Sequence, residues 1–173
     1  VAIAALIAFS GFAAQAQSTY AEIGVGTAKY SEPGITLTPT VARGIIGFNL
    51  NDNFAFEGML ATGMSDGTTT YSGVGVNLKV DSATGAYIKP KVKIGDNAEL
   101  FARAGYTHVT GTATATGNRG SLTLAMSGSS PSFGAGVKFN LSNNSYVVVD
   151  YMSYYSKDGI SVNGYTVGMG FGF

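Results

Sequence analysis

Eight charged side chains are the first candidates for chemistry, because they share one face of segments in which large apolar and small residues alternate. Paired carboxylates among them could act as general acid and base. The alternative interpretation is a structural ion-pair network, because charges inside a narrow protein interior must find partners. Acidic and basic groups are nearly balanced in the set, and this balance favours the network. The eight residues are Glu22, Arg43, Glu57, Lys91, Glu99, Arg103, Lys138 and Asp150.

His108 is the only histidine and the second candidate. A lipid-modifying membrane enzyme could pair such a residue with a hydroxyl nucleophile. Its context, "YTHVTGT", has no serine within two residues, and its parity places it on the outward or rim face. One histidine is too few for an ordinary zinc site, and the chain has no cysteine. We therefore expect an interfacial residue, no enzymatic activity, no metal and no cofactor.

The elements that position these residues are β-strands, since a period of two dominates after Gln17. In residues 133–139, apolar side chains alternate with two glycines and Lys138. In residues 165–173, the odd positions hold only large side chains, and the even positions hold threonine and glycine. Such alternation is typical of strands. No stretch shows sustained helical periodicity, which leaves an antiparallel sandwich or a closed barrel.

The second face of these strands decides between the two architectures. A soluble sandwich has a charged, solvated outer face. Here that face is rich in glycine, and only 12% of residues are charged, against about 25% in typical soluble domains. Formal net charge is zero, which argues against nucleic acid as a partner. The pattern predicts an eight-stranded antiparallel up-and-down transmembrane β-barrel, with apolar side chains outward and small or polar ones inward.

Connection lengths predict how the barrel is oriented. Short polar turns at 51–53, 95–97 and 142–144 alternate with longer connections at 31–39, 62–72, 110–130 and 156–162. Short turns are expected on the periplasmic side and long loops outside. We expect loops 62–72 and 110–130 to form the contact surface for any extracellular ligand. Thr/Ala alternation in 110–130 could extend two strands and present an edge for strand addition; a mobile loop without a partner is an equal alternative.

Residues 73–94 leave the strand count open, because they could form one strand or two. Eight apolar residues of this stretch occupy even positions: Val74, Val76, Leu78, Val80, Ala86, Ile88, Val92 and Ile94. One uninterrupted strand keeps that phase and gives eight strands in all, whereas two would give nine and break the even-number tendency of bacterial barrels, for which ten is the next even count. Pro90 cannot donate to a strand ladder and weakens this assignment.

The first 16 residues form a separate segment. "VAIAALIAFSGFAAQA" is a short apolar stretch that ends in Ala14-Gln15-Ala16. This pattern predicts a cleavable signal peptide, truncated at its N-terminus, over 1–16 and a barrel domain over 17–173. An amphipathic or buried helix is the alternative for 1–16.

Several segments resemble the small bacterial outer-membrane β-barrel family, of the OmpA-transmembrane-domain, OmpX and porin-like type. They are "YAEIGVGTAKY", "IIGFNLNDNFAFEG", "LFARAGYTHV" and "SFGAGVKFNL". The resemblance implies an eight-stranded barrel in outer-membrane lipid and lipopolysaccharide, inserted from the periplasm. It also implies interior charge pairs near Glu22, Arg43, Glu57, Arg103 and Lys138.

The carboxyl end resembles the family's assembly signal, polar-x-Gly-x-x-aromatic-x-aromatic. Thr166, Gly168, Phe171 and Phe173 match its defined positions. The match implies recognition by the outer-membrane barrel assembly machinery. The sequence ends at Phe173, so the peptidoglycan-binding domain of full-length OmpA is not expected.

Together these features predict a non-enzymatic, monomeric outer-membrane barrel of a Gram-negative cell. Its expected role is structural or surface interaction, such as adhesion or envelope integrity. A small diffusion pore is the main alternative, and a lipid-modifying enzyme is the second.

Overall fold

The computed structural model describes residues 19–71, 73–118, 120–157 and 159–173. The predicted signal peptide therefore lies outside the described residues. Within the described part, no helix is long and apolar enough to cross a membrane.

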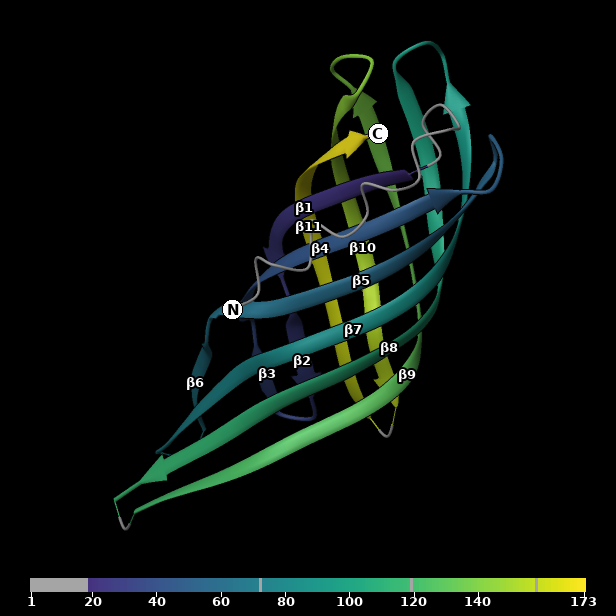
Figure 1. Cartoon of the computed structure of the whole chain (residues 1–173). Coiled ribbons are helices and arrows are strands. Elements are labelled where there is room, and N and C mark those ends of the chain that lie inside the picture. The colour runs from purple at the N-terminus through teal and green to yellow at the C-terminus, as the bar shows by residue number, and fades with distance from the viewer. Residues whose placement is uncertain (1–18, 72, 119, 158) are drawn as a thin grey trace.

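Eight strands of the described chain form a closed antiparallel ring, as the alternation predicted (Figure 1). Their order around the ring follows the sequence, and β1 and β11 close it through pairs from Tyr20↔Gly172 to Gly26↔Thr166. The ring strands are β1 (Thr19–Thr27), β4 (Thr40–Asn49), β5 (Phe54–Ser65), β7 (Val74–Ile94), β8 (Ala98–Gly117), β9 (Gly120–Asn140), β10 (Ser145–Lys157) and β11 (Ile160–Gly172).

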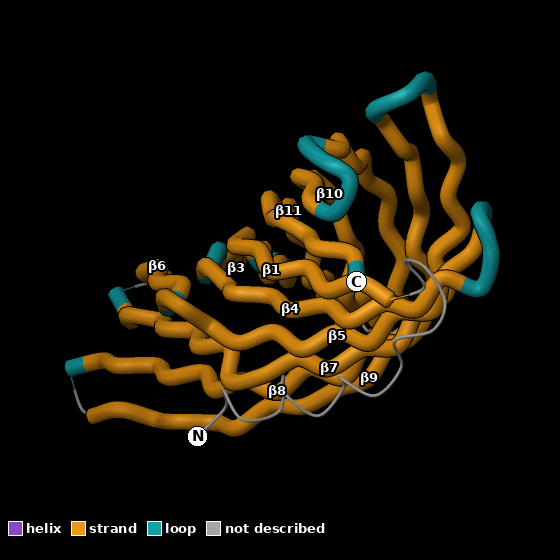
Figure 2. Tube along the Cα trace, turned by 45° about the horizontal axis from the view of Figure 1, so that its top comes forward, coloured by secondary structure: helices purple, strands orange, loops and turns teal. Residues whose placement is uncertain are grey.

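Turns and loops gather at the two ends of the strands (Figure 2). One end, here called the short-turn end, carries the connections near residues 51, 96 and 143 and the closing bond from the Phe173 N–H to the Thr19 carbonyl, 3.0 Å. The opposite, long-loop end carries three short strands: β2 (Lys29–Glu32), β3 (Ile35–Leu37) and β6 (Gly67–Tyr71). β2 pairs with β11 and β3, and β6 pairs with β7. The predicted loops 31–39 and 62–72 are thus partly ordered as strands.

β7 confirms the prediction of a single strand over residues 73–94, but one part of that prediction is wrong. The pairing of β7 with β8 shifts register between Val80 and Ser82. A bulge adds one residue to a strand and reverses which face the following side chains occupy. Tyr87 and Lys89 are buried at odd positions below the bulge, whereas Leu78 is buried at an even position above it. The phase therefore does not continue unchanged along β7.

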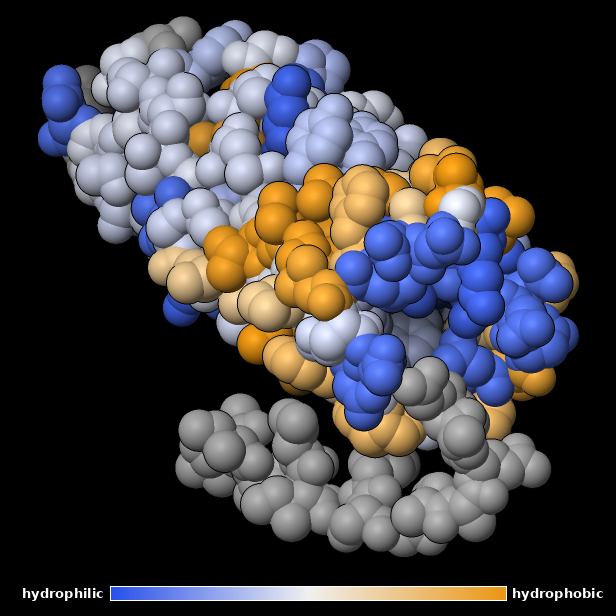
Figure 3. Space-filling view, turned by 90° about the horizontal axis from the view of Figure 1, so that it is seen from above, coloured by the Kyte–Doolittle hydropathy of each residue, from blue (hydrophilic) through white to orange (hydrophobic). Residues whose placement is uncertain are grey.

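The ring has an apolar outer surface and a filled interior. Exposed apolar side chains form a band between the hydrophilic short-turn end and the paler, weakly polar opposite end (Figure 3). Glycines on the inner face make room for large side chains. A Cβ at Gly47 would collide with the ring of Tyr20, and one at Gly170 with the ring of Tyr146. The glycine-rich face is therefore the complement of buried tyrosines and not a solvated surface.

Candidate functional site

Arg103 on β8 lies at the centre of the interior charges and is 1% exposed. Its Nη2 donates to Glu22 Oε2 at 2.8 Å, and its Nη1 donates to Asp150 Oδ2 at 2.7 Å. Its Nε donates to Glu57 Oε2. One guanidinium thus joins carboxylates from β1, β5 and β10, because its donors point in three directions within one plane.

Arg43 on β4 completes the partners of Asp150. Its Nη1 donates to Asp150 Oδ1 at 2.8 Å, and its Nη2 donates to the other carboxylate oxygen. The same Nη1 also reaches Tyr154 Oη at 3.1 Å. This two-pronged geometry is the stronger form of an arginine–carboxylate contact.

Lys89 also belongs to this cluster, although it is not among the eight charges predicted from the sequence to share one face. Its Nζ lies 3.2 Å from Glu22 Oε1 and 2.9 Å from Glu57 Oε1, and 4.3 Å from the centre of the Phe101 ring. Its odd position, shared with Lys91, was the signal that could have identified it. We call the six residues together the ionic layer: Glu22, Arg43, Glu57, Lys89, Arg103 and Asp150.

The other three predicted charges lie outside the ionic layer. Lys138 pairs with Glu99 at 3.2 Å, nearer the short-turn end. Lys91 donates to Asn49 Oδ1 at 2.7 Å. These groups border a polar vestibule of about 760 Å³ that opens at the short-turn end and reaches inward to Lys89.

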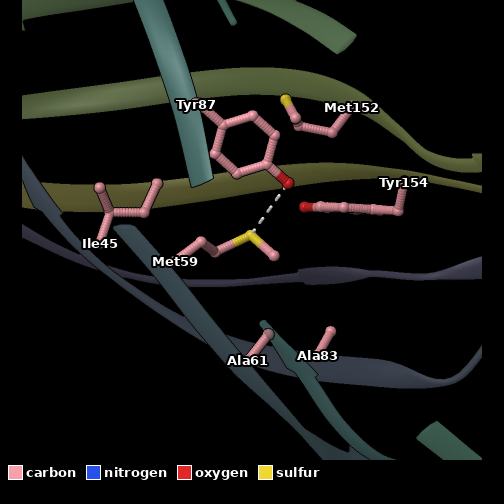
Figure 4. Packing of buried hydrophobic residues seen from close by; sticks show 7 residues of the cluster. All are labelled: Ile45, Met59, Ala61, Ala83, Tyr87, Met152 and Tyr154. Atoms are coloured by element: carbon pink, nitrogen blue, oxygen red, sulfur yellow. Dashed lines mark hydrogen bonds between the residues drawn. The ribbon is translucent and has the colours of Figure 1, made fainter. Parts of the chain in front are cut away.

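A second layer, here called the apolar layer, fills the interior on the long-loop side of the ionic layer. It consists of buried apolar side chains from the four strands β4, β5, β7 and β10, and these side chains point toward one another (Figure 4). The Tyr87 hydroxyl donates to Met59 Sδ at 3.8 Å, and Tyr87 also bonds the Thr107 hydroxyl. Its members are Ile45, Met59, Ala61, Ala83, Tyr87, Met152 and Tyr154.

The ion pairs of the ionic layer limit the reactions that its carboxylates could catalyse. Three carboxylates face three cationic groups, and each carboxylate contacts two of these cations. The two glutamates each also accept a hydrogen bond from a tyrosine. A general acid or base must instead reach a substrate proton. Within the described residues, no group of three or more histidine, cysteine or acidic side chains could hold a metal ion. The arrangement fits a structural interior.

His108 has a hydroxyl neighbour that sequence spacing did not reveal. Its Nδ1 lies 2.8 Å from Ser129 Oγ, because His108 and Ser129 face each other across β8 and β9. The pair is exposed on the outer surface, and the described contacts of His108 include no carboxylate. A cross-strand alignment of residues 98–140 could have predicted this contact.

Beyond the ring, β6, β7, β8 and β9 continue as a projecting sheet at the long-loop end (Figure 1). It comprises residues 67–71, 74–80, 110–117 and 120–130. β8 and β9 pair as far as Gly117↔Gly120, and β7 pairs with β8 as far as Gly75↔Thr116. Most of the predicted loop 110–130 is therefore a two-stranded ladder, and the hypothesis that its alternation extends two strands is confirmed.

The projecting sheet has one apolar and one polar face. Facing residues in a ladder share a face, so the row Leu78, Ala113, Leu124 is apolar. The adjacent row carries Lys79 and Thr112, and Thr112 donates to Asp81 Oδ2 at 2.7 Å. The β9 part of the apolar face is uncovered, as the exposed fractions show: Leu122 61%, Leu124 56%, Met126 37%; Leu78 on β7 is buried.

β9 also has an open edge. β10 pairs with β9 only between Phe133 and Asn140, so residues 121–132, among those described, have no ladder partner on the side away from β8. Pro131 marks the divergence, since proline has no N–H to donate. Near it, side chains replace the ladder: Ser132 Oγ donates to the Ser153 carbonyl at 2.8 Å. We call residues 121–127, all exposed, the β9 edge.

The β2–β3 hairpin lines the barrel side of this region. Tyr30 Oη donates to Glu32 Oε2 at 2.7 Å. Burial and this hydrogen bond raise the pKa of Tyr30 above its ordinary value, so the hydroxyl stays protonated at alkaline pH as well.

A closed antiparallel ring with an apolar outer band and a packed interior defines a transmembrane β-barrel. The model of the outer membrane protein beta-barrel domain family matches residues 1–173, and the chain belongs to that family. Membership places the protein in the bacterial outer membrane.

Several solved structures share the fold. Ail, the attachment invasion locus protein of Yersinia pestis, solved in complex with the heparin analogue sucrose octasulfate, has 19% identity and a TM-score of 0.67 over 92% of this chain and 100% of that chain. Neisserial surface protein A has 13% identity and a TM-score of 0.67 over 92% and 100%. The outer membrane protease OmpT of Escherichia coli has 12% identity and a TM-score of 0.51 over 90% and 96%. No curated protein sequence gave a significant match.

Proposed function

We propose that this protein is a non-enzymatic outer-membrane barrel that mediates attachment at the cell surface through its projecting sheet. The observation that carries the proposal is the combination of an uncovered apolar face with the open β9 edge. Soluble and surface proteins usually protect open strand edges, because such edges pair with other chains. Large exposed apolar patches likewise mark interaction sites.

The barrel itself serves as an anchor in outer-membrane lipid and lipopolysaccharide. The ionic and apolar layers occupy its interior, which weighs against a diffusion pore. His108 and Ser129 form a hydroxyl–imidazole pair without a described carboxylate, which weighs against a lipid-modifying enzyme. Because a protease shares this fold, these residues, and not the fold, support the non-enzymatic role.

Attachment is compatible with a barrel of this shape, as the name of Ail shows for that protein. In the present chain, the surface proposed to contact a partner is the apolar face of the projecting sheet, which is formed by residues of β7, β8 and β9.

A shortened hairpin tests the proposal. Gly111 and Met126 face each other, so residues 112–125 can be replaced by Asn-Gly, the two-residue connection that suits such a hairpin. Cells producing the full chain are expected to adhere to surfaces coated with serum or extracellular-matrix proteins, and cells producing the shortened chain to lose that adhesion.

Heat-modifiable migration of both chains from isolated outer membranes is the control for equal assembly. Equal adhesion by the two chains, or no adhesion by the full chain above cells lacking it, would contradict the proposal.

A further inference from the structure

We propose that the β9 edge accepts an extended peptide as an added strand, and that this peptide alternates apolar and polar side chains. This inference rests on the proposed attachment function and specifies the chemistry of the partner.

The backbone of the β9 edge determines the kind of occupant. In an antiparallel strand, every second residue directs its N–H and C=O to the same side. Along residues 121–127 these groups point away from β8, where the described chain supplies no ladder partner. A row of donors and acceptors at strand spacing is satisfied by another strand, and the peptide backbone provides it.

The two faces of the projecting sheet determine the side chains. A residue of the added strand lies on the same face as the β9 residue opposite it. Positions opposite Leu122, Leu124 and Met126 join the uncovered apolar face. Positions opposite Ser121 and Thr123 join the polar face. A matching peptide therefore has apolar residues at every second position.

The barrel end of this face offers a place for one anchoring side chain. A pocket of about 150 Å³ opens there, and its lining is predominantly apolar. A cavity of about this size holds a group as large as benzene. Apolar anchors buried in such pockets commonly dominate the binding of a partner. The lining includes Leu78, Val109, Met126, Tyr155, Ile160 and Val162.

The packing of β10 limits how far the added strand extends. The Tyr155 ring covers Gly128, where a Cβ would lie 2.9 Å from Tyr155 Cε2. The Ser156 N–H donates to Ser130 Oγ at 3.4 Å, which keeps β10 close to β9 at this level. The peptide therefore pairs with residues 121–127 and ends beside the pocket.

Peptide binding to the purified full chain in micelles tests the inference. The probe is a fluorescent peptide of about ten residues that alternates valine and threonine. A peptide of the same composition, with all valines before all threonines, is expected to bind about tenfold more weakly, because fewer cross-strand pairs match. A fully N-methylated alternating peptide, which lacks backbone donors, is expected not to bind.

Two substitutions at neighbouring positions test whether the apolar face, and not the polar face, binds the peptide. Leu124→Lys places a charge on the apolar face and is expected to abolish binding, whereas Thr123→Lys on the polar face is expected to leave it nearly unchanged. Both positions lie outside the ring, so heat-modifiable migration should remain normal. Equal affinity of the two variants, or equal binding of the alternating and block peptides, would overturn the inference.

The outcomes distinguish this inference from the attachment function. Loss of adhesion on shortening the hairpin, without any preference for the alternating peptide, leaves attachment supported and overturns the peptide chemistry. Preference for the alternating peptide, without adhesion by cells, supports the peptide chemistry and overturns the attachment function. Pairing of two full chains through the β9 edge in native mass spectrometry would also overturn the peptide as occupant.

Discussion

At the scale of single residues, Arg103 shows why the interior charges depend on one another. It shares Glu57 and Glu22 with Lys89, and it shares Asp150 with Arg43. A buried ion pair adds little net stability compared with apolar packing, because desolvation offsets the attraction between the charges. Removal of one partner is costly, since the remaining charges stay buried without compensation.

Arg103→Met is therefore expected to lower the free energy of unfolding by about 3–5 kcal/mol, the range for breaking a buried pair. Lys79→Met is the matched control, because Lys79 pairs with Asp81 at 3.7 Å and the two side chains are exposed by 60% and 40%. Its expected effect is about 1 kcal/mol or less. Urea unfolding in micelles measures both, and similar losses in the two variants would count against a special role for the ionic layer.

The positions of these residues were more predictable than their partners. A strand has a period of two in any context, so parity placed Glu22, Arg43, Glu57, Arg103 and Asp150 on one face. The ion pairs among these five residues join positions 46 to 107 apart in the sequence. Alternation does not indicate which strands bring their side chains together inside the barrel. Lys91 and Lys89 share a parity, and only their depth along β7 separates the one near the vestibule from the one in the layer.

At the scale of elements, β7 shows where the sequence pattern stopped being informative. Apolar residues continue at even positions through Val76 and Leu78. Below the bulge such residues face outward from the ring, and above it they face the inner side of the projecting sheet. Both surfaces are apolar, so the same alternation fits both, and a one-residue bulge leaves no trace in it.

The last strand, β11, carries the proposed assembly signal in two chemically different halves. Thr166 and Gly168 face the interior, where a Cβ at Gly168 would lie 2.5 Å from the Ile23 carbonyl oxygen. Phe171 and Phe173 are exposed by 46% and 62%. The inner half is required for close pairing of β11 with β1, whereas the aromatic half has few contacts to lose within the folded barrel.

Phe173→Ala is thus expected to lower the amount of assembled protein several-fold while changing the unfolding free energy of the assembled barrel by about 1 kcal/mol or less, as for exposed positions. Val167→Ala, an exposed substitution on the same face of β11, is the matched control and should assemble normally. Quantification of the heat-modifiable form in outer membranes measures assembly. Unchanged levels of the Phe173 variant would contradict the assembly role.

At the scale of the whole molecule, the interior has a clear order along the barrel axis. The polar vestibule leads to the ionic layer, the apolar layer follows, and the apolar pocket lies at the long-loop end. An eight-stranded barrel is just wide enough for side chains to fill it. Composition and strand count predicted this filling, whereas no pattern in the sequence indicated that charged and apolar side chains separate into layers.

The purified full chain in planar lipid bilayers is expected to show no stable, reproducible conductance steps, because an ion would have to cross both layers. A mock preparation from cells lacking the protein is the control for contaminating channels. Reproducible steps that appear only with the full chain would contradict the anchor role and favour the pore.

The pairing of β1 with β11 has a further consequence for how the chain reaches its final state. Contacts such as Tyr20↔Gly172 join the two extremes of the described sequence, and contacts so distant in sequence form slowly. Until they form, two strand edges remain open, and hydrocarbon offers their backbone groups no partner. A chain interrupted before β11 therefore has no partly stable intermediate form to adopt inside the bilayer. We therefore expect ring closure to make insertion an all-or-none event, so that only chains complete through β11 remain in the bilayer.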